Sequence, residues 1–238
     1  MRALFIQQDH VSPVGHVGTA FTARGYDVET MLVVPEERFA QPDVTVRFPD
    51  PTAYDVIVPM GAPWSVYDQG TIGTWVGDEV AFLAAAHESG VPIFAICFGG
   101  QALATALGGR VESSPVPELG WTSIATDDAG LVGPGPWFHF HYDRWAVPPG
   151  AREVARTGSA SQAFVVGRSL AVQFHPELTA ATLRGWNDNG GRDLLVAHGI
   201  EPDGLLADTV ADEPAAAARA DQLVEGFLTR VAVAEPVP

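Results

Sequence analysis

One stretch of the chain decides its fold: residues 91–101, which read VPIFAICFGGQ. The apolar residues 93–97 predict a strand that is buried on both faces. Gly99 and Gly100 then let the backbone turn sharply into a helical run, Gln101–Leu107. Cys97, the only cysteine among 238 residues, therefore lies at a turn from strand to helix.

A cysteine at such a turn is a candidate nucleophile. The unpaired N–H groups of a helix N-terminus and the positive end of its dipole favour the thiolate form. A lone cysteine is also often an inert, small, buried hydrophobic residue. The position of Cys97 alone leaves both interpretations open.

A second apolar strand ends in three polar or turn-forming residues: residues 170–177 read LAVQFHPE. Pro176 stops strand pairing, so His175 and Glu177 follow directly after a strand end. Active sites gather at the carboxyl ends of strands in open α/β sheets. His175 and Glu177 are two residues apart, so in extended chain their side chains point the same way. The Glu177 carboxylate can then orient the His175 imidazole toward a thiol from another strand. The pattern predicts a Cys-His-Glu triad; the alternative is a surface turn.

Five motifs, in the same order along the chain, carry a resemblance to a known family. Residues 97–101, CFGGQ, match C-x-G-x-Q, and residues 173–177 match Q-F-H-P-E. Residues 61–66, GAPWSV, resemble G-G-P-x-S-V; residues 118–121, ELGW, resemble E-x-G-W; residues 161–164, SQAF, contain Q-A-F. The sequence thus resembles class I (triad-type) glutamine amidotransferases from about residue 3 to 185. It is most similar to stand-alone members that are like the glutaminase domain of GMP synthase.

The resemblance implies a reaction and a set of site residues. Cys97 would attack the side-chain amide of glutamine, release ammonia and form a γ-glutamyl thioester, with His175 as acid and base and Glu177 orienting it. Backbone N–H groups of Ala62 and Phe98 would form the oxyanion hole, and substrate contacts would come from Gly61, Gln101, Glu118 and Trp121. Ala62 replaces the second glycine of the family motif. If a positive φ were required there, its Cβ would cost roughly 1–2 kcal/mol.

Alternating strands and helices along the chain predict the fold class. We expect strands at 3–7, 26–32 and 54–59, and helices at 14–24 and 75–89, around the strand that precedes Cys97. Residues 111–149, rich in Pro and Gly, predict antiparallel strands and loops beside the main sheet. The prediction is α/β: an open, mostly parallel, doubly wound sheet with helices on both faces, as in flavodoxin-like and class I glutamine amidotransferase-like proteins.

We expect a single domain spanning residues 1–238, with a helical C-terminal extension over about 180–234. That extension is predicted to be interrupted at the Gly- and Asp-rich residues 187–193. The run 215–231 then ends the fold, and residues 235–238 form a frayed tail.

Composition excludes several competing classes. The net charge of −16 argues against a nucleic-acid partner, which would require a basic face. No apolar segment is long enough for a membrane span, and a single cysteine suits the reducing cytoplasm. All thirteen basic residues are arginine, so neither a P-loop lysine nor a lysine Schiff base can form on this chain. We expect no cofactor and no metal.

Residues 139–143, HFHYD, offer a weaker signal. His139 and His141 lie on one face of a predicted strand and, with Asp143, could bind a metal. A structural or substrate-contact role near the mouth of the site is the favoured interpretation, because the resembled family often has a His and an Asp here.

Three functions remain open. The chain is either a glutaminase component that passes ammonia to a separate synthetase subunit, or a self-sufficient hydrolase of γ-glutamyl amides or peptides. The third hypothesis is a non-catalytic binding module on the same scaffold, which the intact set of Cys97, His175 and Glu177 disfavours.

Overall fold

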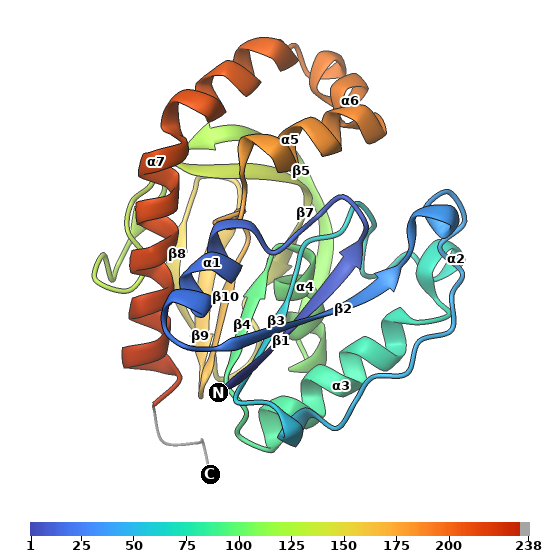
Figure 1. Cartoon of the computed structure of the whole chain (residues 1–238), viewed down its shortest axis with the longest axis vertical. Coiled ribbons are helices and arrows are strands. Elements are labelled where there is room, and N and C mark those ends of the chain that lie inside the picture. Colours follow the sequence, from blue (N-terminus) through green and yellow to red (C-terminus); the bar gives the residue numbers. More distant parts are fainter. Residues whose placement is uncertain (234–238) are drawn as a thin grey trace.

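The centre of the fold is an eight-stranded, mostly parallel sheet (Figure 1), in a computed structural model that describes residues 1–233. The strand order is β2-β1-β3-β4-β10-β9-β8-β6. The five parallel strands come first in this order: β2 (Asp27–Val34), β1 (Arg2–Asp9), β3 (Val56–Pro59), β4 (Ile93–Ile96) and β10 (Ser169–Val172). The antiparallel remainder comprises β9 (Ser161–Val166), β8 (Arg152–Arg156) and β6 (Ala125–Thr126). The parallel part therefore has the 2-1-3-4-5 order of flavodoxin-like sheets, which confirms the predicted fold class.

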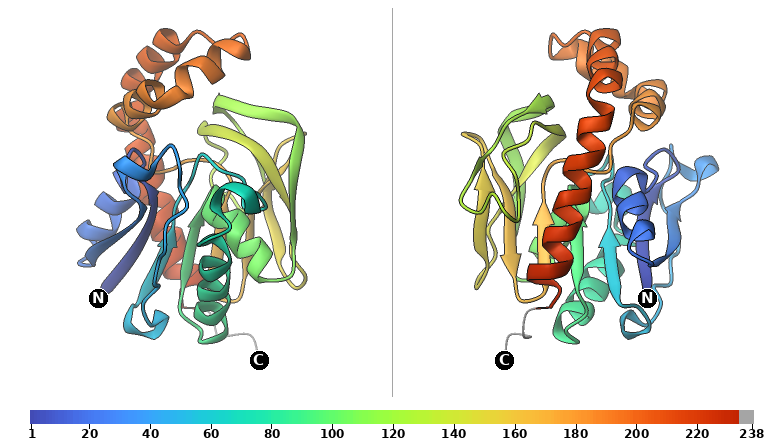
Figure 2. Two further views of the ribbon diagram at one scale, coloured as in Figure 1. Left: turned by 90° about the vertical axis from the view of Figure 1, so that its right-hand side faces the viewer. Right: turned by 60° about the vertical axis from the view of Figure 1, so that its left-hand side comes forward.

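Helices cover both faces of this sheet (Figure 2). On one face lie α1 (Gly15–Ala23) and the long α7 (Pro202–Gly226), over a core rich in phenylalanine. On the other face lie α3 (Val76–Glu88) and α4 (Phe98–Ala106), over a core that includes Trp75. Because β4 and its neighbours bury apolar side chains on both faces, their sequences are continuous apolar runs without alternation.

A two-stranded antiparallel sheet stands beside the main one, as expected for residues 111–149. It pairs β5 (Arg110–Thr122) with β7 (Trp137–Ala146), and a register shift separates Ser113 from Glu118. The hairpin lies on the side of the molecule opposite α1 (Figure 2).

A helical layer lies across the carboxyl ends of the parallel strands (Figure 1). It contains α5 (Ala180–Trp186), a π-helical turn at Asn187–Gly191 with non-helical backbone, and α6 (Arg192–Ala197). The irregular turn falls where the interruption was predicted. Among the shorter elements are α2 (Gln69–Ile72) and 3-10 turns at Glu36–Arg38 and Pro51–Ala53.

The final helix, α7, starts at Pro202, within the helical pattern predicted from residue 180 onward. The Glu201 carboxylate caps it by accepting hydrogen bonds from the N–H groups of Asp203 and Gly204. Pro214 lies inside this helix without ending it. The helix after Cys97 starts at Phe98, three residues earlier than predicted, since both glycines are accommodated in its first turn. The predicted tail at 235–238 lies outside the described residues.

No helix within residues 1–233 combines the length and hydropathy that a bilayer-spanning segment requires.

A buried acid on α3 gives the fold a pH dependence. Glu79 is fully buried and accepts a 2.6 Å hydrogen bond from Gln8 Nε2; burial raises its pKa from 4.5 to about 8. The folded state therefore holds this proton more tightly than the unfolded state, so stability is lost as pH rises between about 4.5 and 8. The free energy of unfolding should fall by up to about 1.4 kcal/mol for each pH unit in this range, and Glu79→Gln should remove this fall.

Denaturant unfolding at several pH values from 5 to 9 tests this expectation. Glu88→Gln, on the exposed face of the same helix, is the matched control. A pH slope that is the same in Glu79→Gln and in Glu88→Gln would contradict the assignment.

Candidate active site

Cys97 occupies a strained turn between β4 and α4. Its φ of 50° and ψ of −109° make it the one non-glycine residue with positive φ in the described part of the chain. Its N–H donates a 2.7 Å hydrogen bond to the Val172 carbonyl, which anchors the turn to β10. A Cβ at Gly99 would lie 2.2 Å from the Pro59 carbonyl oxygen, so only glycine lets α4 start this close to β3. Strain of this kind presents a nucleophile at a sharp strand-to-helix turn.

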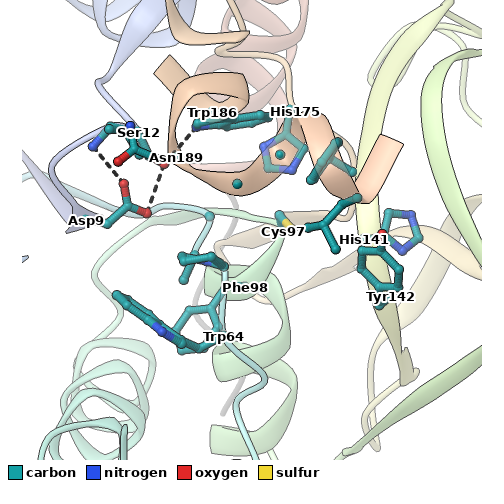
Figure 3. A pocket seen from close by; sticks show the side chains of 18 of the residues that line it. Asp9, Ser12, Trp64, Cys97, Phe98, His141, Tyr142, His175, Trp186 and Asn189 are labelled. Atoms are coloured by element: carbon teal, nitrogen blue, oxygen red, sulfur yellow. Dashed lines mark hydrogen bonds between the residues drawn. The ribbon is translucent and has the colours of Figure 1, made fainter. Parts of the chain in front are cut away.

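His175 and Glu177 follow β10 and are both buried. The Nδ1 atom of His175 lies 2.8 Å from Glu177 Oε1. A carboxylate can only accept, so Nδ1 carries a proton and donates it. His175 Nε2 has no hydrogen-bond partner, and the ring lies beside Cys97 at the cavity (Figure 3).

The electrostatic surroundings of His175 favour the imidazolium. Burial lowers the pKa of His175, but the negative charges of Glu177 and of a Cys97 thiolate outweigh it and raise the pKa to about 10.

A chain of two glutamines reaches the sulfur of Cys97. Gln173 Nε2 donates to Cys97 Sγ at 3.6 Å, and Gln101 Nε2 donates to Gln173 Oε1 at 3.3 Å. Gln101, predicted to contact substrate, does line the cavity, yet its side chain also positions Gln173. The sequence predicts no role for Gln173, although this residue opens the Q-F-H-P-E motif two positions before His175.

The loop after β3 brings Gly61 and Ala62 to the same cavity. A Cβ at Gly61 would lie 2.9 Å from His175 Cε1 and 3.6 Å from Cys97 Cβ, so the backbone of this loop passes directly against both side chains. Since Cys97 alone among non-glycine residues 1–233 has positive φ, Ala62 carries no left-handed strain. The expected penalty for Ala62 is therefore absent. Phe98 opens α4, where first-turn N–H groups have no partner within the helix.

The cavity that contains these groups measures about 570 Å³. Much of its wall is aromatic, as Figure 3 shows for Trp64, Tyr142 and Trp186. Asp9, at the end of β1, and Asp143, on β7, place carboxylates in the wall. Asp143 accepts hydrogen bonds from Ser65 Oγ and Tyr67 O–H, so it is a fixed acceptor. The aromatic wall was not predicted, because its members come from segments far apart in the sequence.

Comparison with known proteins assigns the family. A model described as glutamine amidotransferase class-I matches residues 23–185. The chain belongs to this family.

Proteins similar to this chain include GMP synthases. The glutamine-hydrolysing GMP synthase of Aeropyrum pernix is 39% identical over 130 residues, which cover 51% of this chain and 24% of that protein. That of a Parafrankia species is 34% identical over 169 residues, covering 67% of this chain and 30% of that protein. The matched part is thus less than a third of the length of either synthase.

A solved glutamine amidotransferase structure from Thermotoga maritima aligns with a TM-score of 0.81 and 22% identity, over 96% of this chain and 98% of that one. At that identity the likeness supports the fold alone.

Two residues predicted to contact substrate lie away from the cavity of the amidotransferase. Trp121 donates from its indole N–H to Thr209 Oγ1 on α7 and packs edge-to-face on Phe138, so it joins β5 to α7. Glu118 is also absent from the cavity wall. Both expectations came from the E-x-G-W resemblance. In the structure, Trp121 contacts Thr209, and Glu118 contacts Gln162 and His141.

Glu118 has two histidines of β7 for neighbours. His141 Nε2 lies 3.4 Å from Glu118 Oε2 and 3.4 Å from His139 Nδ1. Burial lowers the pKa of His139 to about 3 and that of His141 to about 4. The predicted partner of the histidines, Asp143, instead contacts Ser65 and Tyr67 through its carboxylate.

Proposed function

We propose that this protein hydrolyses the side-chain amide of glutamine, or of a γ-glutamyl amide, through a thioester on Cys97. One observation carries the proposal: Cys97 sits at a strained elbow in a cavity beside a His175 ring that is held by Glu177. A nucleophile, a base and an orienting group in this relation are the components of covalent acyl transfer.

The first half-reaction forms the thioester. The Cys97 thiolate attacks the amide carbonyl carbon, and the oxyanion of the tetrahedral intermediate accepts hydrogen bonds from the N–H groups of Ala62 and Phe98. His175 gives the Nε2 proton to the amide nitrogen, the C–N bond breaks, and ammonia or an amine leaves.

The second half-reaction clears the thioester. Neutral His175 takes a proton from water, the resulting hydroxide attacks the thioester carbonyl, and the C–S bond breaks to release glutamate and the thiolate. Glu177 keeps the Nδ1 proton in place through both halves and stabilises the imidazolium.

The fate of the released nitrogen distinguishes two versions of this function. The similarity to part of the glutamine-hydrolysing GMP synthases supports a glutaminase component whose ammonia is consumed by a separate synthetase subunit. The cavity supports the alternative of a γ-glutamyl amide hydrolase, because about 570 Å³ with aromatic walls is in the range that binds drug-sized ligands, larger than glutamine.

Substrate comparison tests the proposal. We expect the isolated protein to release ammonia from glutamine slowly, because an unpartnered glutaminase would otherwise waste its substrate. Ammonia release from glutamine and amine release from γ-glutamyl dipeptides are measured as kcat/KM in parallel, with Cys97→Ala as the blank. A much larger kcat/KM for the dipeptides assigns the hydrolase, whereas no Cys97-dependent release from any substrate would contradict the catalytic function.

A further inference from the structure

We propose that Glu118, His139 and His141 bind a divalent transition-metal ion, Zn²⁺ or one of similar chemistry, which ties β5 to β7 at the part of the cavity wall that His141 forms. The three ligand atoms all lie within 4.8 Å of one another. This site lies outside the triad and needs no assumption about the reaction.

Strand pairing explains why the three side chains converge. Glu118 on β5 is directly opposite His141 on β7, and Gly120 is opposite His139. Residues 139 and 141 are two apart in the strand, so their side chains share one face of the hairpin with Glu118. Because the two paired strands already hold the three side chains together, the site is largely formed before an ion binds.

The tautomer of His141 places a nitrogen lone pair at the centre of the cluster. His141 Nδ1 lies 3.1 Å from the Asp143 carbonyl oxygen, which only accepts, so Nδ1 is the protonated nitrogen of a neutral ring. His141 Nε2 is then a bare acceptor that faces another acceptor, Glu118 Oε2, at 3.4 Å. Repulsion between two such lone pairs is relieved by a cation placed between them.

Distances in the cluster match the separation of ligands around one ion. With Zn–N and Zn–O bonds of about 2.0–2.1 Å in tetrahedral geometry, ligand atoms are roughly 3.3–3.4 Å apart. His141 Nε2 lies 3.4 Å from both Glu118 Oε2 and His139 Nδ1. The third pair, Glu118 and His139, lies within 4.8 Å, and small side-chain rotations would bring these two ligand atoms to the same separation.

The surroundings of the cluster support a ligand role. Gln162 Nε2 on β9 donates a 2.7 Å hydrogen bond to Glu118 Oε2, which fixes the carboxylate as outer-shell groups do in metal sites. His139 is fully buried, and its Nδ1 faces the cluster from β7. Two imidazoles and one carboxylate favour Zn²⁺, Fe²⁺ or Co²⁺ over Mg²⁺ and Ca²⁺, which prefer oxygen.

Zinc binding to chelator-treated protein tests the proposal. Equilibrium dialysis is done in a Cys97→Ser background, so that the catalytic thiolate does not compete for the ion. We expect one Zn²⁺ per chain, no comparable Mg²⁺ binding, and a loss of at least about 100-fold in affinity for Glu118→Gln and for His139→Gln. His198→Gln, at an exposed histidine, is the matched control and should bind like the parent.

Two further measurements keep the test decisive if His139→Gln folds poorly. Glu118→Gln is nearly isosteric and can still accept from Gln162, so its circular dichroism should match the parent. Anomalous scattering from a Zn²⁺-soaked crystal should place the ion between Glu118, His139 and His141. Equal affinity in Glu118→Gln and His198→Gln, or an ion found elsewhere, would overturn the proposal.

Discussion

Replacing Cys97 with serine should reduce kcat on the preferred substrate by a factor on the order of 10⁵ or more, the scale seen when a covalent nucleophile is removed. The serine hydroxyl fits the space of the thiol, but it lacks the readily formed anion that attacks the amide. Cys97 is buried, but serine has nearly the same size and shape, so the melting temperature should stay within a few degrees of wild type. Steady-state kinetics and thermal denaturation of the same preparation check both points.

Substantial turnover in Cys97→Ser or Cys97→Ala would contradict covalent catalysis at this residue. Since no second cysteine exists in the 238 residues, no other thiol could account for the remaining activity.

The second large effect is expected at His175. His175→Ala removes both the acid for the leaving nitrogen and the base for water, so kcat should fall on the order of 10⁵-fold or more. Glu177→Gln should cost about a hundredfold less, because the base remains and still reaches its working orientation part of the time. Full kinetics on both variants separate kcat from KM, and the loss should appear mainly in kcat.

His198→Ala, at an exposed histidine outside the cavity wall, serves as the control for loss of an imidazole. If kcat falls only slightly, and by a similar factor, in His175→Ala and His198→Ala, then His175 is neither the acid nor the base of the reaction. A loss in Glu177→Gln equal to that in His175→Ala would mean that Glu177 does more than orient the ring.

The main sheet and the elbow were predictable because their signals are local. Apolar runs that are buried on both faces mark parallel strands, and the Gly99-Gly100 pair after Cys97 marks a sharp turn. The association of His175 with Glu177 also followed from their spacing in extended chain after β10.

Side-chain relations across distant segments could not be predicted in this way. Gln101 and Gln173 are 72 residues apart, and only the meeting of α4 with the end of β10 brings their amides together beside the sulfur. The neighbours of the two histidines show the same limit. The register of β5 on β7 places Glu118 opposite His141, whereas the sequence suggested the adjacent Asp143.

The start of α7 shows a different limit. Its first half is rich in acidic residues and contains Pro214, a residue type that disfavours a helix interior, and no start was predicted for it. The Glu201 cap and burial of Leu205 and Thr209 beneath the helical layer stabilise this half, and neither could be read without the tertiary contacts.

The most direct test of the account is covalent labelling with a glutamine-mimicking electrophile, followed on one sample by peptide mass spectrometry and by residual activity. The account predicts a single label on Cys97, loss of activity in proportion to the labelled fraction, and protection by the preferred substrate. Full labelling of Cys97 with undiminished activity would contradict it, and so would inactivation by a label on any other residue.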